Sequence, residues 1–161
     1  MTVEDLLAKQ AIHDALVTWC RGIDRLDAAL VSSVYHPDAV DERPGFTLHG
    51  GEAGARTIPR LRDTTTATLH SISNELVTVR GDQADSECHF VARNLYTDGT
   101  MAESCGRYLD RFERRNGEWK IAHRRVILEW RRVFAKEELE LETNRSTALR
   151  SREDASYTPL P

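Results

Sequence analysis

Long apolar runs, paired cysteines and a basic excess are all missing from this chain. None of its 161 residues belong to a run approaching the roughly 20 apolar residues that cross a bilayer. Residues 1–10 carry acids and no apolar segment of the kind found in a secretory signal. The net charge of −4 gives no electrostatic reason to expect nucleic acid. We therefore expect neither a membrane nor a nucleic acid as partner.

Cysteine and histidine spacings exclude several site classes. The three cysteines, Cys20, Cys88 and Cys105, are an odd number without CxxC spacing, which argues against a disulfide framework or a zinc site and favours a reducing cytoplasm. The histidines show neither HxH nor HExxH spacing. A GxSxG elbow and a phosphate-binding loop are also missing. We therefore expect no metal and no cofactor.

The first 62 residues predict helices. Thr2 and Asp5 form a capping-box pattern, and apolar residues then recur at helical spacing to about Gly22. A second, shorter helix is expected from Asp27 to the Tyr-His-Pro-Asp turn at 35–38, since the residue before proline is pushed out of the helical region. A short strand with a Pro44-Gly45 break over 38–48 and a third helix over 50–62 complete this part.

Long strands dominate the second half. Four runs rich in Val, Ile, Tyr and Phe cover 69–80, 84–96, 102–114 and 119–134, joined by Gly81-Asp82, Asp98-Gly99 and Asn116-Gly117 turns. Helices followed by a long antiparallel sheet predict an α+β fold, a cone-shaped barrel that three N-terminal helices close around a pocket. We expect one domain over 1–135 and a C-terminal extension over 136–161, of which 146–161 is flexible or draped over a neighbour.

Two short segments carry the chemistry. Gly22-Ile23-Asp24-Arg25 places a carboxylate at the end of the first helix, and Leu69-His70-Ser71 places an imidazole at the start of a strand. A carboxylate that orients a histidine makes a general base, and such a base in a dry pocket can take a proton from carbon. The bland alternatives are a core histidine satisfied by a backbone group and an aspartate that caps the next helix.

Other side chains are candidates for lining the pocket. Period two along the last strand puts Trp119, Ile121, His123 and Arg125 on one face, so His123 and Arg125 are expected to face the pocket. Pairing with acids such as Glu129, or with a neighbouring subunit, is the alternative for both. Tyr35 is expected near the end of the second helix, as an acid or hydrogen-bond donor, or simply as a core tyrosine. Three further residues are pocket-lining candidates: Trp19, Asn74 and Tyr108.

The chain resembles the SnoaL-like branch of the nuclear-transport-factor-two-like superfamily. The resemblance rests on Gly-Ile-Asp at 22–24, on Leu-His-x3-Asn at 69–74 and on the hairpin Asp-Arg-Phe-Glu-Arg-Arg-Asn-Gly-Glu-Trp-Lys-Ile at 110–121. That branch includes scytalone dehydratase, bile-acid dehydratases and lindane dehydrochlorinase. In those enzymes an aspartate after the first helix and a histidine at a strand start form a base dyad, which the resemblance assigns to Asp24 and His70.

These observations predict a cofactor-independent lyase or isomerase acting on a small, apolar, cyclic molecule: a polyketide, steroid, terpenoid or xenobiotic. Arg125, His123 or Tyr35 would steady the departing group. Two alternatives remain open. One is a non-catalytic binding or assembly module, like the small subunit of ring-hydroxylating dioxygenases. The other is a water-activating epoxide hydrolase built on Arg107 or Arg125 with Asp110. The mixed apolar and arginine pattern of the outer sheet face predicts self-association into a homo-oligomer, and the family resemblance implies a dimer or trimer.

Overall fold

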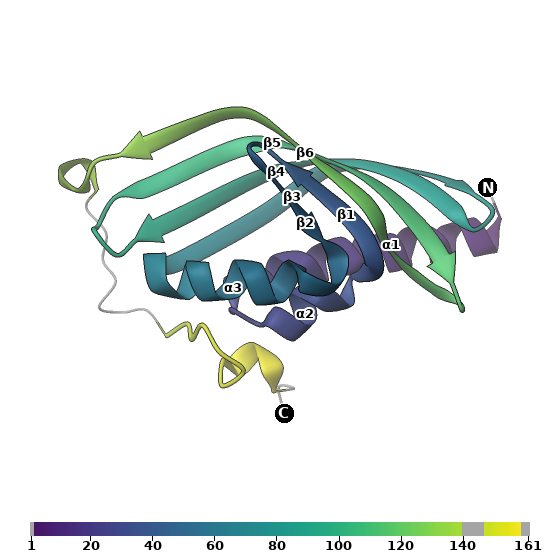
Figure 1. The fold of residues 1–161 in the computed structure, drawn as a ribbon, viewed down its shortest axis with the longest axis horizontal. Coiled ribbons are helices and arrows are strands. Elements are labelled where there is room, and N and C mark those ends of the chain that lie inside the picture. The colour runs from purple at the N-terminus through teal and green to yellow at the C-terminus, as the bar shows by residue number, and fades with distance from the viewer. Residues whose placement is uncertain (1, 140–146, 159–161) are drawn as a thin grey trace.

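A computed structural model describes residues 2–139 and 147–158. In this part of the chain, three helices pack against one face of a six-stranded sheet (Figure 1). The helices are α1 (Val3–Asp24), α2 (Ala28–Ser33) and α3 (Ala53–Thr64). The strands are β1 (Tyr35–Arg43), β2 (Phe46–His49), β3 (Thr65–Arg80), β4 (Gln83–Tyr96), β5 (Met101–Arg115) and β6 (Glu118–Phe134). Short 3₁₀ turns cover Gly50–Glu52, Lys136–Glu138 and Ala155–Tyr157.

Helix α1 begins with the predicted capping box. The Thr2 hydroxyl accepts a hydrogen bond from the Asp5 N–H at 3.1 Å, and the Asp5 carboxylate accepts one from the Thr2 N–H at 2.7 Å. Its buried side chains recur every three or four residues along one face: Ala8, Ile12, Leu16, Trp19, Cys20 and Ile23. The helix ends at Asp24, so its final residue carries a carboxylate into the protein interior.

Helix α2 is shorter than predicted. Asp27 caps it by accepting hydrogen bonds from the N–H groups of Ala29 and Leu30. The prediction that Tyr35 ends this helix is wrong, because Tyr35 is the first residue of β1 and pairs with Ile121 of β6. Pro37 sits where the β1–β6 pairing is interrupted, so its missing N–H costs no ladder bond. The extended backbone that proline imposes on its predecessor suits a strand as well as a turn.

The single strand expected over 38–48 is a hairpin. β1 and β2 pair antiparallel around Pro44 and Gly45, and Gly45 has a left-handed φ of +88°. The glycine satisfies this turn without the clash that a Cβ would bring. The predicted third helix is α3, which follows a 3₁₀ turn and contains Pro59. These elements close one end of the fold.

The four long strands are confirmed, with β3 starting earlier than predicted, at Thr65. The hairpin turns contain Gly81, Gly99 and Gly117, all with positive φ, and Asn116 precedes the last of them with φ +53°. The sheet order is β2-β1-β6-β5-β4-β3. All neighbouring strands are antiparallel except β1 and β6, which are parallel. Long-range pairing of this kind has no local sequence signal.

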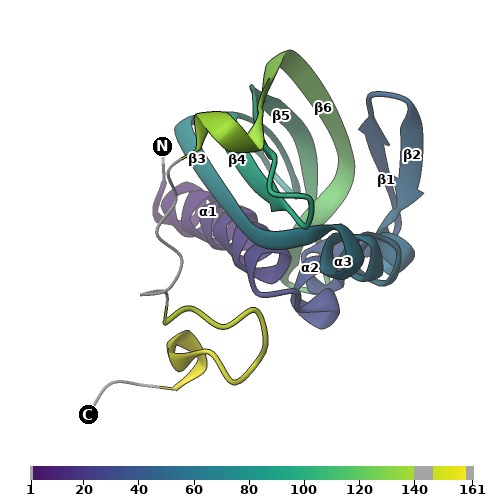
Figure 2. The same ribbon diagram turned by 90° about the vertical axis from the view of Figure 1, so that its left-hand side faces the viewer.

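The sheet curls around the helices into an open cone (Figure 2). Its concave face carries apolar residues from β4, β5 and β6, and α1 covers this face with Ile12, Leu16 and Trp19. The fold is therefore α+β, as predicted, and the cone is closed by helices rather than by sheet hydrogen bonds.

The described part of the C-terminal extension contacts the junction between α1 and α2. Arg152 forms an ion pair with Asp27 at 2.9 Å, and the Tyr157 hydroxyl donates to the same carboxylate at 3.0 Å. Arg25 pairs with Asp154 at 3.2 Å. This segment therefore lies on its own chain; residues 140–146 and 159–161 of the predicted extension fall outside the described residues.

Among the helices in residues 2–139 and 147–158, none combines the length and the apolar composition needed to cross a membrane.

Candidate active site

The structure brings Asp24 and His70 together. The Asp24 Oδ1 atom lies 2.7 Å from His70 Nδ1, and Asp24 Oδ2 accepts the backbone N–H of the same histidine at 2.9 Å. The two side chains are about one-tenth exposed, at 11% and 9%. Two contacts between one carboxylate and one residue fix the imidazole in position as well as in tautomer.

The proton on the His70 ring is placed by its partner. An ionised carboxylate can only accept hydrogen bonds, so Nδ1 carries the hydrogen and Nε2 carries the lone pair. Among described residues, none makes a hydrogen bond to Nε2. Some polar side-chain atoms of the described residues are fully buried and have no hydrogen-bond partner, for example Trp19 Nε1 and Thr68 Oγ1. His70 Nε2 is not among these fully buried atoms. The basic nitrogen is therefore uncommitted.

Aromatic side chains fill the cone beside the dyad. The Trp19 ring meets the His70 ring edge-on, with centroids 5.5 Å apart. Tyr108 contacts Trp19 at 5.4 Å and stacks on Phe90 at 4.5 Å. Trp19 and Tyr108, predicted to line a pocket, are buried and with Phe90 fill the interior on this side of the imidazole.

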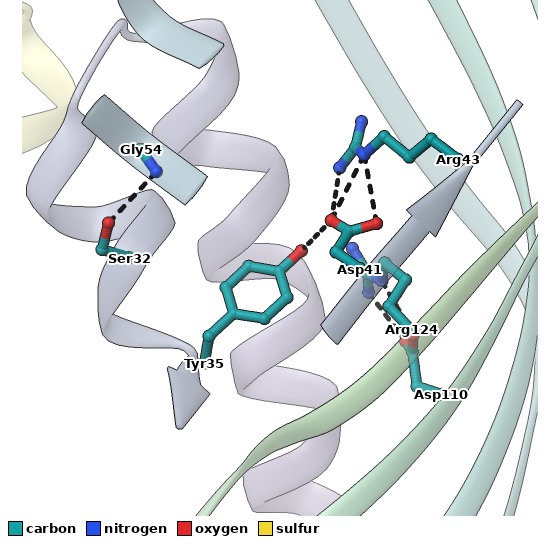
Figure 3. A network of polar contacts seen from close by, with 7 residues as sticks. All are labelled: Ser32, Tyr35, Asp41, Arg43, Gly54, Asp110 and Arg124. Carbon is teal, nitrogen blue, oxygen red and sulfur yellow. Dashed lines mark hydrogen bonds and ion pairs between the residues drawn. The ribbon is translucent and has the colours of Figure 1, made fainter. Parts of the chain in front are cut away.

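A buried ionic network lies beyond these rings (Figure 3). Arg124 donates two hydrogen bonds of 2.7 Å to Asp110, and both side chains have no exposed area. Burial opposes the charge of Arg124, but the Asp110 carboxylate raises the pKa of the guanidinium well above its ordinary value. The Arg124 charge also lies 4.3 Å from the Tyr108 ring and 5.0 Å from the Trp19 ring.

Tyr35 belongs to the same interior network and not to the dyad. Its hydroxyl donates to Asp41 at 2.8 Å, and Asp41 also binds Arg43 at 2.8 Å (Figure 3). Burial raises the pKa of the Tyr35 phenol. The hydroxyl is therefore committed to Asp41, and its predicted contact with a departing group finds no support in this geometry.

The predicted placement of His123 and Arg125 inside the cone is wrong. Arg111 pairs with His123 and Phe112 with Ile121, so Ala122 is an extra residue in β6 that has no partner in β5. This bulge reverses the alternation that places Ile121 inside. His123 and Arg125 therefore lie on the outer face, where both contact Glu42, at 3.4 Å and 2.7 Å.

Asn74 is also displaced from its predicted position by a bulge. The β3–β4 pairing is interrupted between Ser73 and Leu76, and Asn74 is exposed with a left-handed φ of +52°. Its side chain lies 3.4 Å from His89 of β4, so it does not line the interior beside His70.

The arginines named for a hydrolase do not meet Asp110. Arg107 binds Glu129 and Glu87 on the outer face, and Arg125 binds Glu42 there, whereas Asp110 is buried inside.

A cavity of about 420 Å³ opens at the mouth of the cone. Its wall includes Ile23, the neighbour of Asp24, and Asn94 of β4. Asn94 is two residues from Ala92, which pairs with His70, so by strand alternation Asn94 shares the inner face with that histidine. Asp24 and His70 do not line this cavity themselves. Asp24 follows the wall residue Ile23 on α1, and His70 pairs with Ala92, two residues from the wall residue Asn94.

Sequence reasoning missed four arginines near the interior. Arg43 and Arg60 line the mouth cavity, and Arg124 sits deeper in the cone. Arg150 of the extension donates to the Thr65 carbonyl at 2.5 Å. Burial lowers the pKa of Arg150, while the nearby Asp24 carboxylate works against that change. The inward direction of the Arg124 side chain follows from the bulge at Ala122, and a bulge has no reliable sequence signal.

Within the described residues, no three His, Cys, Asp or Glu side chains cluster as metal ligands would.

Residues 4–125 match the family described as the SnoaL-like domain. Similar solved structures include a hexachlorocyclohexane dehydrochlorinase, LinA type 2, at 19% identity and a TM-score of 0.79, covering 88% of this chain and 98% of that one. A "Putative Scytalone Dehydratase" from Novosphingobium aromaticivorans has 19% identity and a TM-score of 0.75, covering 88% and 94%. A "putative aromatic ring hydroxylase" from the same organism has 22% identity and a TM-score of 0.72, covering 83% and 94%.

No curated protein sequence matches the chain. At identities of 19–22%, the solved structures establish the shared cone fold and not the activity. The family match is broader evidence, because it spans most of the chain, from the capping region of α1 into β6. This chain therefore belongs to the SnoaL-like family, within the nuclear-transport-factor-two-like superfamily.

Proposed function

We propose that this protein is a cofactor-independent lyase or isomerase of the dehydratase or dehydrohalogenase type, with Asp24 and His70 as its base dyad. The observation that carries the proposal is the double contact of Asp24 with His70, which leaves Nε2 with an uncommitted lone pair. Histidine is the usual protein base at neutral pH, and an adjacent carboxylate stabilises the imidazolium that forms.

The proposed step removes a proton from a carbon next to the one that bears the leaving group. His70 Nε2 takes the proton, the electron pair of the broken C–H bond forms a double bond, and the leaving group departs with its own bonding pair. A departing hydroxide can take the proton from Nε2 and leave as water. A departing halide leaves as the anion, and Nε2 returns its proton to solvent. In an isomerase, the proton would return to another carbon instead.

Relatives support this reaction class by name. The fold neighbours include a hexachlorocyclohexane dehydrochlorinase and the "Putative Scytalone Dehydratase", names that describe eliminations. The substrate of this chain is expected to be a small molecule, because the mouth cavity of about 420 Å³ lies in the usual range for ligand sites. The dehydrochlorinase named for hexachlorocyclohexane favours a ring compound.

Turnover by three variants tests the proposal. A panel of hydroxylated and halogenated ring compounds, including scytalone and hexachlorocyclohexane, is screened for water or chloride loss. On any compound turned over, Asp24→Asn and His70→Gln should each lower kcat by about 10²–10⁴-fold, the usual contribution of general-base catalysis. His89→Gln is the matched control, because His89 lies on β4 and its ring faces the exposed Asn74.

Nitrogen NMR of the His70 ring gives a readout that needs no substrate. The proton should sit on Nδ1 in the native chain and lose that preference in Asp24→Asn. Undiminished turnover in His70→Gln would refute the base assignment.

The filled inner cone favours one second candidate, a non-catalytic binding or assembly module. Trp19, Phe90 and Tyr108 occupy space that a deep substrate pocket would need. Under that alternative, the purified chain would turn over no compound of the panel and would instead bind a larger enzyme subunit. Co-purification with a tagged oxygenase subunit encoded beside it would support the alternative.

A further inference from the structure

The mouth cavity is lined by arginines and by no acidic residue of the described chain. Arg43 of β1 and the pair Arg56 and Arg60 of α3 contribute to its wall. The last two are four residues apart on α3, so their side chains project from the same helix face. The whole protein carries a net charge of −4, so a positive opening is a local feature and not a reflection of overall charge.

The three guanidinium groups differ in how far they are neutralised. Arg43 is held by Asp41 at 2.8 Å and is 18% exposed. Arg56 lies 3.7 Å from Glu52, and both side chains are more than 60% exposed, so water and salt screen that pair. Arg60 is exposed, and its guanidinium makes no ion pair or hydrogen bond within the described residues. Within residues 2–139 and 147–158, the rim therefore holds one guanidinium without an ionic partner and a second that is weakly paired.

The inner wall of the same cavity is apolar. Ile23 and Leu48 are buried there, and Leu61 of α3 is half-buried. Thr57, Arg60, Leu61 and Thr64 recur at helical spacing, so one face of α3 runs from the charged rim towards the apolar wall. Ile23 adjoins Asp24, so the apolar end of the cavity is the end nearer the dyad.

We propose that this mouth binds an oxyanion group, and that the substrate is an apolar ring compound carrying such a group, a carboxylate for example. The ring would lie against Ile23, Leu48 and Leu61, and the anion would meet Arg60 and Arg56 at the rim. Arginine presents a planar fork of N–H donors that matches a carboxylate or sulfonate. The identification of this ligand as the substrate rests on the proposed function, whereas the anion site can be tested without catalysis.

Two fluorescent probes that differ by one anionic group provide the test. Anilinonaphthalene sulfonate carries a sulfonate, and N-phenylnaphthylamine has the same ring system without it. The native chain should bind the sulfonate at least about fivefold more tightly at low salt, and the preference should shrink as salt is added. Arg60→Gln should weaken sulfonate binding about fivefold, and Arg56→Gln/Arg60→Gln by more than about tenfold, with binding of the neutral probe unchanged.

Two further variants make the test specific. Arg60→Lys retains the charge and should keep most of the sulfonate preference. Arg62→Gln removes the same charge from the same helix, but Arg62 lines a separate hollow beside Arg25 and Asp27, so this variant should bind both probes as the native chain does. Equal weakening of both probes in Arg60→Gln would overturn the proposal, and so would loss of sulfonate binding in Arg62→Gln instead.

Asp24→Asn and His70→Gln separate this proposal from the proposed function. Neither residue lines the mouth, so both variants should bind the sulfonate normally. If His70→Gln kept full turnover and Arg60→Gln lost sulfonate binding, only the lyase proposal would be refuted. If His70→Gln lost turnover and Arg60→Gln kept sulfonate binding, only the anion site would be refuted.

Discussion

Replacing Arg124 by methionine should destabilise this protein more than replacing Arg124 and Asp110 together. Both side chains are fully buried and joined by two hydrogen bonds of 2.7 Å. Methionine keeps the length of the arginine side chain but leaves the Asp110 carboxylate without a partner. Breaking a buried pair in this way costs about 3–5 kcal/mol, whereas replacing both members by apolar residues is often neutral.

The aromatic contacts of Arg124 add to this cost. Its guanidinium lies 4.3 Å from the Tyr108 ring and 5.0 Å from the Trp19 ring, and a desolvated cation–π contact is worth about 1–2 kcal/mol. The single variant Arg124→Met should therefore lose roughly 4–7 kcal/mol of unfolding free energy, a large share of the about 5–15 kcal/mol typical of a domain. Its Tm should fall by roughly 10–20 °C. The double variant Asp110→Leu/Arg124→Met should lose only about 1–2 kcal/mol.

The pH dependence of the single variant follows from Asp110. Burial raises the pKa of this carboxyl, and removing Arg124 takes away the charge that opposes the rise. An acid whose pKa is higher in the folded state binds its proton more readily there than in the unfolded state. The folded state therefore gains stability as pH falls towards about 4, the ordinary pKa of aspartate. The penalty in Arg124→Met should be full at pH 7 and smaller at pH 5.

Urea unfolding followed by tryptophan fluorescence at both pH values measures these differences. Arg93→Met is the control, because Arg93 pairs with Glu103 at the surface and is 47% exposed, so it should change stability by less than about 1 kcal/mol. If the single and double variants were equally stable at pH 7, the argument that Asp110 becomes an uncompensated buried charge would fail.

Two further predictions concern the thiols and the free edge of β6. Burial raises the pKa of the Cys20 thiol to about 11 and that of the Cys88 thiol to about 12. Neither thiol should therefore react with a thiol reagent at pH 8 until the chain is denatured. Rapid labelling of either cysteine in the native protein would contradict this prediction. Beyond Arg125 no described strand pairs with the outer edge of β6, and Trp130 there is 49% exposed. We predict that copies of this chain associate along this edge, as the expected dimer or trimer. In light scattering, Trp130→Glu should then give a monomer and Leu76→Glu on β3 should not; a monomeric native chain would refute this prediction.

Local patterns determined most of the secondary structure. The capping box and apolar spacing of α1 depend on residues three or four apart, and the hairpin turns depend on a glycine that adopts positive φ. Because these are short-range effects, the chain sequence expresses them directly. The sequence also supplied Asp24 and His70 as a pair, although through family resemblance and not through spacing, since 46 residues separate them.

Non-local contacts decided which side chains face the interior. One unpaired residue, Ala122, reversed the alternation of β6, so Arg124 points into the cone and His123 and Arg125 point out. Sequence patterns predict Tyr35 near the end of a helix, but it lies in the sheet because β1 pairs in parallel with β6. A period-two reading assumes unbroken pairing, and only the packing of strands far apart in sequence determines where the pairing breaks. The same is true of the arginines at the mouth, which come from β1 and α3 and meet only in the folded cone.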